Sequence, residues 1–303
     1  MRNRISVFLI TLSGLILEVG LTRIYSASIW YHFAFVAISV ALLGWGLGGF
    51  TVHLLKKVRP MTMNAAAVVT ILYALAIPLC LWLLVRYPFD MDRLPLYFLA
   101  PLLPFFLAGM ALSIIFDIHR AESGSLYFYD LVGAALGAVL VTLLLHVFGG
   151  EAALLVGSIA PACAALLISL SASAKTVRVA TVIALLITSA AAFSAIKFGA
   201  FRVKPGTTKA MRNQMDAAPG SRVTQTGWNS YSRIDAVEGV ERSRGGKIEL
   251  ERRRGRSGGK EAPRTTMRTT VLTTLRAPKG GGTQQLGGMR RLLGLLAEAA
   301  PPK

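Results

Sequence analysis

Residues 125–147 read SLYFYDLVGAALGAVLVTLLLHV, and no side chain from Ala134 to Leu145 is charged. A helix needs about 20 mainly apolar residues to cross the hydrocarbon core of a bilayer, and this stretch is long enough. A transmembrane strand would alternate apolar and polar residues with a period of two. The unbroken apolar run excludes that alternation and predicts a transmembrane helix.

The same kind of run recurs through the first two-thirds of the chain. Short polar separators with Lys, Arg, Pro or Gly-Gly lie between the runs. The first run carries Glu18 and has no small-x-small cleavage site, so we interpret it as a retained span and not as a signal peptide. We predict an all-α membrane protein, a polytopic bundle of about seven transmembrane helices. The predicted spans are 5–27, 31–55, 64–86, 94–116, 125–147, 151–171 and 177–198.

Composition divides the chain after residue 198. The whole chain of 303 residues is 53% hydrophobic, with a mean hydropathy of +0.55. Residues 1–198 hold 12 Lys and Arg against 7 Asp and Glu, whereas residues 199–303 hold 21 against 8. Such asymmetry indicates a domain boundary. We predict a transmembrane domain over 1–198, a linker over 199–221, a β-hairpin over 222–238 and a disordered basic tail over 239–303.

The hairpin and the tail are predicted from different signals. Arg222 to Gln225 and Tyr231 to Glu238 resemble two short strands, and the second shows partial alternation. Residues 239–303 contain no Phe, Trp or Tyr, while 12 Gly and 11 Arg take 23 of the 65 positions. That segment cannot bury enough apolar surface to offset its chain entropy, so we expect it to be disordered.

Orientation follows from the Lys and Arg content of the loops. With a cytoplasmic N-terminus, the inside segments carry eight such residues and the outside loops before the seventh span carry three. This difference predicts a multi-pass protein of the plasma (inner) membrane with its N-terminus in the cytoplasm. If the outside count also includes Lys197, Arg202 and Lys204, the inside and outside counts become eight and six. The side that holds the C-terminus therefore stays open.

Among the ionisable residues within the predicted spans, Glu18, Arg23 and Asp130 are the candidates for a functional role. Ionisable groups inside a bilayer are costly and usually face a partner or a wet cavity. One interpretation makes Glu18 a site for a proton, a cation or a polyamine. The other makes it a structural partner of Arg23 or of a group on another helix. Asp130 is either an interfacial anchor or a functional carboxylate.

Glycines at helical spacing predict close helix packing at two places. Gly44 and Gly48 lie on one face of the second span, and Gly133 and Gly137 lie on one face of the fifth. Small residues four positions apart let another helix approach closely. No strand precedes these glycines, so the pattern does not indicate a phosphate-binding loop.

No catalytic, cofactor-binding or metal-binding residue is predicted. The four histidines show no i, i+3 or i+4 pairing, and Cys80 and Cys163 both lie in apolar runs. The basic block from Arg252 to Arg256 would attract RNA or anionic lipid. It has no aromatic residues for base stacking, so a nucleic-acid partner is not favoured. The expected partners are the lipid bilayer and a polyamine or another cation.

Four stretches together resemble the membrane-embedded branch of the spermidine synthase-like family. Their residues are SGLILE (13–18) with LTR (21–23), LLGWGLGG (42–49), YDLVGAALGA (129–138) and WNSYSRID (228–235). The resemblance implies a multi-span module before a Rossmann-like domain that transfers an aminopropyl group from decarboxylated S-adenosylmethionine to a diamine such as putrescine, without a metal. It places Trp228, Asn229, Ser232, Arg233 and Asp235 in the opening strand motif of that domain.

The chain departs from the family after this motif. The family continues into a glycine-rich strand-to-helix turn, acidic residues that bind the cofactor and a catalytic Asp. Nothing in residues 239–303 matches that continuation. Our hypothesis is that this tail is an out-of-frame or rearranged reading, which the encoding DNA around codon 239 would test. The resemblance therefore predicts a spermidine synthase-like membrane protein without transferase activity. The alternative is a transport or binding module for cations or polyamines that uses intramembrane carboxylates.

Overall fold

Seven helical spans make up the part of the chain that a computed structural model describes before residue 202. That part comprises residues 1–29, 33–170 and 174–201, and five short strands are described further along. Each of the seven spans is long and apolar enough to cross a membrane. The predicted helical bundle of a multi-pass membrane protein is confirmed.

Eight α-helices form these spans, because the sixth span is built from two. The helices are α1 (Arg2–Ser28), α2 (Phe33–Leu55), α3 (Met63–Arg86), α4 (Leu94–Ile118), α5 (Ser123–Phe148), α6 (Gly150–Gly157), α7 (Ile159–Ser169) and α8 (Lys175–Phe198). Single 3₁₀ turns, η1 (Met91–Arg93) and η2 (Arg120–Glu122), precede α4 and α5.

Local sequence explains several of the helix ends. The side chain of Thr62 caps α3 by accepting a hydrogen bond from the backbone N–H of Ala65. Gly149 and Gly199 end α5 and α8 with φ of 84° and 61°, values that L side chains rarely adopt. The sixth span breaks at Ser158 because Pro161 has no N–H to donate to the Gly157 carbonyl.

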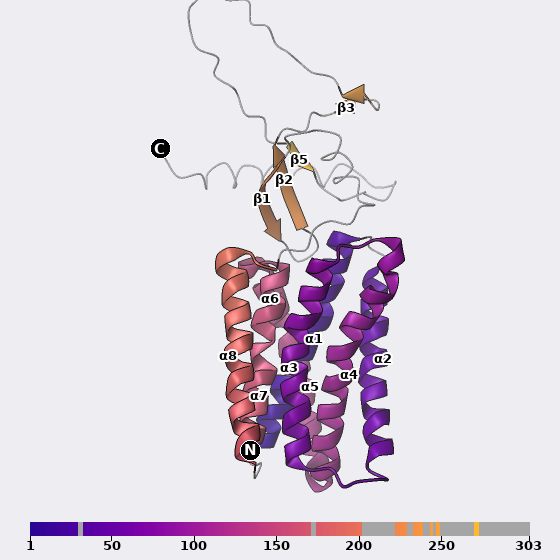
Figure 1. The fold of residues 1–303 in the computed structure, drawn as a ribbon, viewed down its shortest axis with the longest axis vertical. Helices are drawn as coiled ribbons and strands as arrows, with labels where there is room; N and C mark the ends of the chain where they lie inside the picture. Colours follow the sequence, from indigo (N-terminus) through magenta and orange to yellow (C-terminus); the bar gives the residue numbers. More distant parts are fainter. Residues whose placement is uncertain are drawn as a thin grey trace, which may run out of the picture. The chain divides into compact units, whose positions relative to one another are not determined.

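α1 is the central helix of the bundle. The helices run side by side with their axes roughly aligned (Figure 1), and α1 packs against α2, α4, α5, α6 and α7. Gly133 of α5 meets Phe8 of α1, and Gly137, one turn further on, meets Leu12. From the first contact to the second, the residue numbers increase along both helices, so α1 and α5 run parallel.

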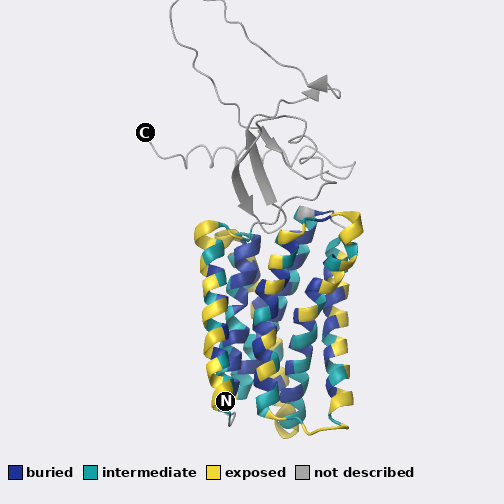
Figure 2. Ribbon diagram, in the orientation of Figure 1, coloured by how far each residue is buried: buried dark blue, intermediate teal, exposed yellow. Residues whose placement is uncertain are grey.

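Burial separates the faces that pack from the faces that meet lipid. Dark blue residues lie where helices face one another, and yellow residues lie on the outer faces of the bundle (Figure 2). Many of the exposed side chains are large and apolar, among them Leu42, Val139 and Leu143. An exposed apolar surface of this extent is suited to a hydrocarbon environment.

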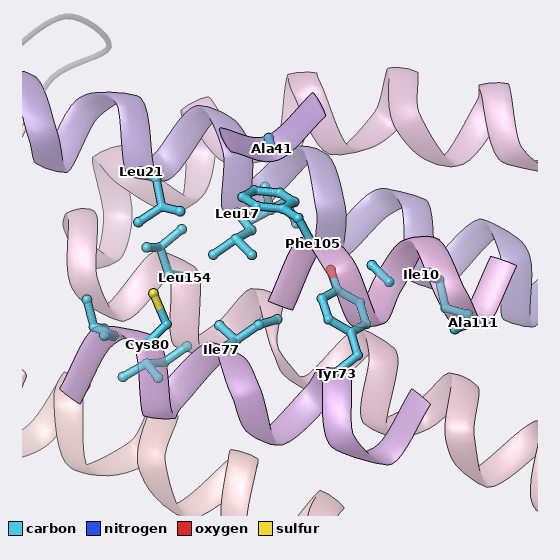
Figure 3. Close-up of a cluster of buried hydrophobic side chains, with 14 of the residues drawn as sticks. Ile10, Leu17, Leu21, Ala41, Tyr73, Ile77, Cys80, Phe105, Ala111 and Leu154 are labelled. Carbon is cyan, nitrogen blue, oxygen red and sulfur yellow. The ribbon is translucent and has the colours of Figure 1, made fainter. Parts of the chain in front are cut away.

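The core consists of aliphatic and aromatic side chains from most of the helices. Leu17 and Leu21 of α1 face Leu154 of α6, and Cys80 and Ile77 of α3 lie close by (Figure 3). Cys80 is 2% exposed and therefore serves as a small apolar residue.

The strands beyond residue 221 are β1 (Arg222–Trp228), β2 (Arg233–Glu238), β3 (Ser243–Arg244), β4 (Lys247–Ile248) and β5 (Thr270–Leu272). β1 pairs antiparallel with β2, β2 with β5, and β3 with β4. β1 runs three residues beyond the predicted Gln225, because Gly227 and Trp228 still pair with Ile234 and Arg233. Most of the predicted linker, from residue 202 onward, and most of the predicted tail lie outside the described residues.

Candidate functional site

The tightest contact of the central helix is with α5. A Cβ added at Gly137 would lie 2.5 Å from the Leu12 carbonyl oxygen and 3.0 Å from the Leu15 Cβ. At Gly133 a Cβ would overlap the Phe8 carbonyl oxygen and the Thr11 hydroxyl. Only glycine permits this approach of the two backbones, which is the packing that small residues provide between membrane helices.

The other predicted glycine pair lies between α2 and α4. A Cβ on Gly44 would come within 2.6 Å of the Phe105 Cβ, and one on Gly48 within 2.6 Å of the Met110 backbone nitrogen. Gly109 of α4 meets the backbone of Trp45 in return. These two glycines of α2 therefore touch α4.

α1 reaches α2 through Trp45. A Cβ on Gly14 would lie 2.7 Å from Cζ2 of the indole ring. Trp45 is flanked in sequence by Gly44 and Gly46, of which the first faces α4 and the second has nothing within 4 Å of a built Cβ. One tryptophan thus links α1 to the α2–α4 pair.

Glu18 lies in the middle region of α1 and is partly exposed. Gly14, one turn before it, contacts Trp45 of α2, and Leu15, three residues before it, contacts Gly137 of α5. The Glu18 side chain accordingly lies on the side of α1 between its α2 and α5 contacts. Among the described residues, Glu18 forms no hydrogen bond and no ion pair.

Arg23 does not pair with Glu18. The two residues are about 140° apart around the helix axis, at about 100° per residue, so they leave α1 in different directions. The Nε atom of Arg23 is buried and has no hydrogen-bond partner in the described part of the chain.

Asp130 and Glu18 do not come together. The Thr11 hydroxyl donates to the Asp130 backbone carbonyl over 3.1 Å, which places Asp130 beside Thr11. Thr11 precedes Glu18 by seven residues, a rise of about 10 Å along α1. The backbone carbonyl of Asp130 thus lies about two helical turns from Glu18 along the axis of α1.

Buried hydroxyl groups join the helices across the core. Tyr73 of α3 donates to the Ser13 hydroxyl of α1 over 3.2 Å, and Tyr25 of α1 donates to the Tyr97 carbonyl of α4 over 2.6 Å. The Tyr97 hydroxyl in turn donates to the Tyr87 carbonyl just past the end of α3, over 3.1 Å. These bonds satisfy polar groups that would otherwise be costly inside a bilayer.

The bundle end that holds the N-terminus carries a network of charged and polar side chains. Arg4 pairs with Glu122 at 2.9 Å, Lys56 pairs with Asp117 at 3.3 Å, and Arg120 also pairs with Asp117. Asn3 and His119 are hydrogen-bonded, with 2.7 Å between Nδ2 and Nε2. The network ties the α4–α5 loop to the ends of α1 and α2.

Glu151 is an intramembrane carboxylate that the sequence analysis missed. It is 8% exposed and lies in the first turn of α6, where the helix dipole favours negative charge. Its signal in the sequence is an acidic residue placed directly after Gly149-Gly150, at the start of an apolar run.

In the described residues, no three His, Cys, Asp or Glu side chains gather where they could hold a metal ion. Of the family-motif positions, Trp228 lies in β1, and Arg233 and Asp235 lie in β2. Asn229 and Ser232 lie outside the described residues.

Comparison with protein-family models, with curated proteins and with solved structures gives no match.

Proposed function

We propose that this chain is the membrane module of a spermidine synthase-like protein and that, by itself, it transfers no aminopropyl group. One observation supports the proposal above the others. The three membrane stretches that resemble the family, 13–23, 42–49 and 129–138, meet one another around α1. Gly14 of the first contacts Trp45 of the second, and Gly137 of the third contacts Leu15 of the first and Leu12 just before it.

The contacts between these stretches offer a physical reason for the residues on which the resemblance depends. Apolar spans in general need no glycine at a fixed spacing, because lipid tolerates any apolar side chain. Gly137 and Gly14 are needed where they stand because the neighbouring helix occupies the space of a Cβ. Gly14, Trp45 and Gly137 of the resembling stretches therefore bring α2 and α5 against α1.

The proposed lack of transferase activity rests on residues 239–303. The strand before Gly280-Gly281-Gly282, β5, has only three residues and pairs antiparallel with β2, and only Glu298 follows those glycines as an acidic residue. A cofactor site of the family type needs both a glycine-rich turn after a strand and acidic side chains.

The direct test is an assay of the purified protein with putrescine and decarboxylated S-adenosylmethionine. A soluble aminopropyltransferase in the same detergent serves as the positive control. We expect no spermidine above the blank by mass spectrometry. Spermidine formed in repeated turnovers would contradict the proposal.

We also propose an inner-membrane location with the N-terminus in the cytoplasm. The described helix ends on the N-terminal side carry eight Lys and Arg against Asp117 and Glu122. The opposite ends carry Arg23, Arg86, Arg93 and Lys197 against Asp90, Asp92 and Glu151. The more basic end is the one that the positive-inside rule retains in the cytoplasm.

A second candidate function is cation binding by an intramembrane carboxylate, and the position of Glu18 favours it. Among the intramembrane carboxylates, Glu18 lies nearest the middle of its span. It forms no ion pair with the described residues. Replacing Glu18 by Gln should abolish binding of spermidine or another cation to the protein in vesicles. Glu122→Gln, at the aqueous end, is the matched control, and unchanged binding in Glu18→Gln would favour a structural role.

A further inference from the structure

Glu18 occupies a position near the bilayer midplane. It lies about 24 Å along the axis from Arg2 and about 15 Å from Ser28, at about 1.5 Å per residue. The span that contains it runs from Arg2 to Ala27. A bilayer centred on this span places the exposed part of the side chain at the depth of the hydrocarbon core.

From Thr11 to Thr22, the described face of α1 that carries Glu18 holds hydroxyl groups but no Lys or Arg. Thr11 and Thr22 lie seven residues before and four residues after Glu18, and therefore on the same face of α1. Their hydroxyls donate to backbone carbonyls, Thr11 to Val7 over 3.1 Å and Thr22 to Val19 over 2.7 Å. Both hydroxyls are thus already engaged within α1.

The helices on either side of Glu18 offer no counter-charge. The described titratable groups of α2 and α5 are His53, Tyr127, Tyr129, Asp130 and His146. None of these side chains forms a hydrogen bond or an ion pair with Glu18. Arg23, the nearest arginine along α1, points in another direction.

A single carboxyl in this setting is poorly suited to a metal ion or a polyamine. A divalent cation needs several oxygen ligands, and a polyamine carries charges that call for several acceptors. The acidic residue of α5, Asp130, has its backbone carbonyl about 10 Å from Glu18 along the axis of α1. A proton needs only one carboxyl, and an isolated carboxylate in hydrocarbon is neutralised more cheaply by protonation than by any other means.

We propose that Glu18 binds a proton and holds it near the bilayer midplane, on the side of α1 between α2 and α5, where the carboxyl is accessible from the lipid. The proposal deepens the second candidate function by naming the proton as its cation. It is independent of the spermidine synthase-like proposal, because aminopropyl turnover would overturn that proposal and leave this one standing.

The test is modification of the full-length protein in lipid vesicles with dicyclohexylcarbodiimide, which partitions into the bilayer and reacts with protonated carboxyl groups. The carboxyl O–H adds across one C=N bond of the reagent, and its proton moves to the carbodiimide nitrogen. The resulting O-acylisourea rearranges to a stable N-acylurea with no leaving group. We expect Glu18 to gain the mass of one reagent molecule, and Glu18→Gln to lose that adduct completely.

Glu122 is the internal control, because it is exposed to water and paired with Arg4. A water-soluble carbodiimide should modify Glu122 and leave Glu18 unmodified. Absence of an adduct on Glu18 in the folded protein would overturn the proposal.

Labelling in the presence of spermidine or Mg²⁺ separates the proton from other cations. A proton site keeps its full labelling, whereas protection by either cation would overturn the proton assignment while supporting the broader cation-binding function. The labelling is measured on the wild-type chain, so a folding defect in Glu18→Gln does not affect this result. Circular dichroism shows whether Glu18→Gln is folded. If it is folded, the loss of its adduct is due to the missing carboxyl.

Discussion

Gly137 of α5 lies so close to Leu12 of α1 that a Cβ at this position would be 2.5 Å from the Leu12 carbonyl oxygen. Leu12 and Gly137 are 125 residues apart in the sequence, and together with the contact of Gly133 with Phe8 their contact shows that the first and fifth spans run parallel. Three of the stabilising features described above, and the orientation of the bundle, are open to direct measurement.

Gly137→Leu should destabilise the bundle by at least about 1–3 kcal/mol, because the added side chain forces α5 away from α1. Unfolding in mixed micelles with increasing SDS measures the loss. Gly46→Leu is the matched control, since nothing lies within 4 Å of a Cβ at Gly46. Equal unfolding midpoints for the two variants would contradict the α1–α5 contact.

Tyr73→Phe should lower the free energy of unfolding by about 1 kcal/mol, because it removes the buried hydrogen bond to Ser13. Tyr127→Phe changes a side chain that is 57% exposed and should have no effect. Ser13→Ala should cost a similar amount, and the double variant should cost less than the sum of the two single variants. Strict additivity would show that the two hydroxyls do not interact.

Arg4→Gln should change the unfolding midpoint only slightly. Arg4 and its partner Glu122 are 37% and 51% exposed, so water and salt screen their attraction. Whatever effect appears at low ionic strength should disappear at high salt. A large loss that persists at high salt would mean that this pair is shielded from solvent in the membrane.

Orientation predicts which loops a membrane-impermeant thiol reagent reaches in right-side-out vesicles. In a background with Cys80→Ala and Cys163→Ala, Asp92→Cys should be labelled from outside and Lys57→Cys only after the vesicles are opened. Both positions are exposed, so accessibility to the reagent depends on the side of the membrane alone. The reverse pattern would place the N-terminus outside.

The spans could be predicted from the sequence because each is an apolar run closed by polar or glycine-containing separators. The break at Ser158 could not, since Pro78, Pro101 and Pro104 lie inside continuous helices and Pro161 alone accompanies an interruption. The effect of a proline depends on whether neighbouring helices hold the two sides in line.

The sequence did not predict which helices pack against one another. Spacing identified Gly133 and Gly137 as a close-packing face, but no local pattern shows that α1 is the helix they meet. The separation of Glu18 from Asp130 has the same origin, because it depends on the axial register of two helices. Glu151 was missed because it stands at the edge of a run, where an acidic residue also suits a loop.

The central claim is a bundle of seven spans over residues 1–198, and an odd number of spans places its two ends on opposite sides of the membrane. In the cysteine-free background, Arg2→Cys and Ala200→Cys test this claim most directly, since Arg2 is the exposed first residue of the first span and Ala200 is exposed just past the last span. We predict that an impermeant thiol reagent applied to sealed vesicles labels one of these variants and not the other. Labelling of both from the same side would contradict the seven-span bundle.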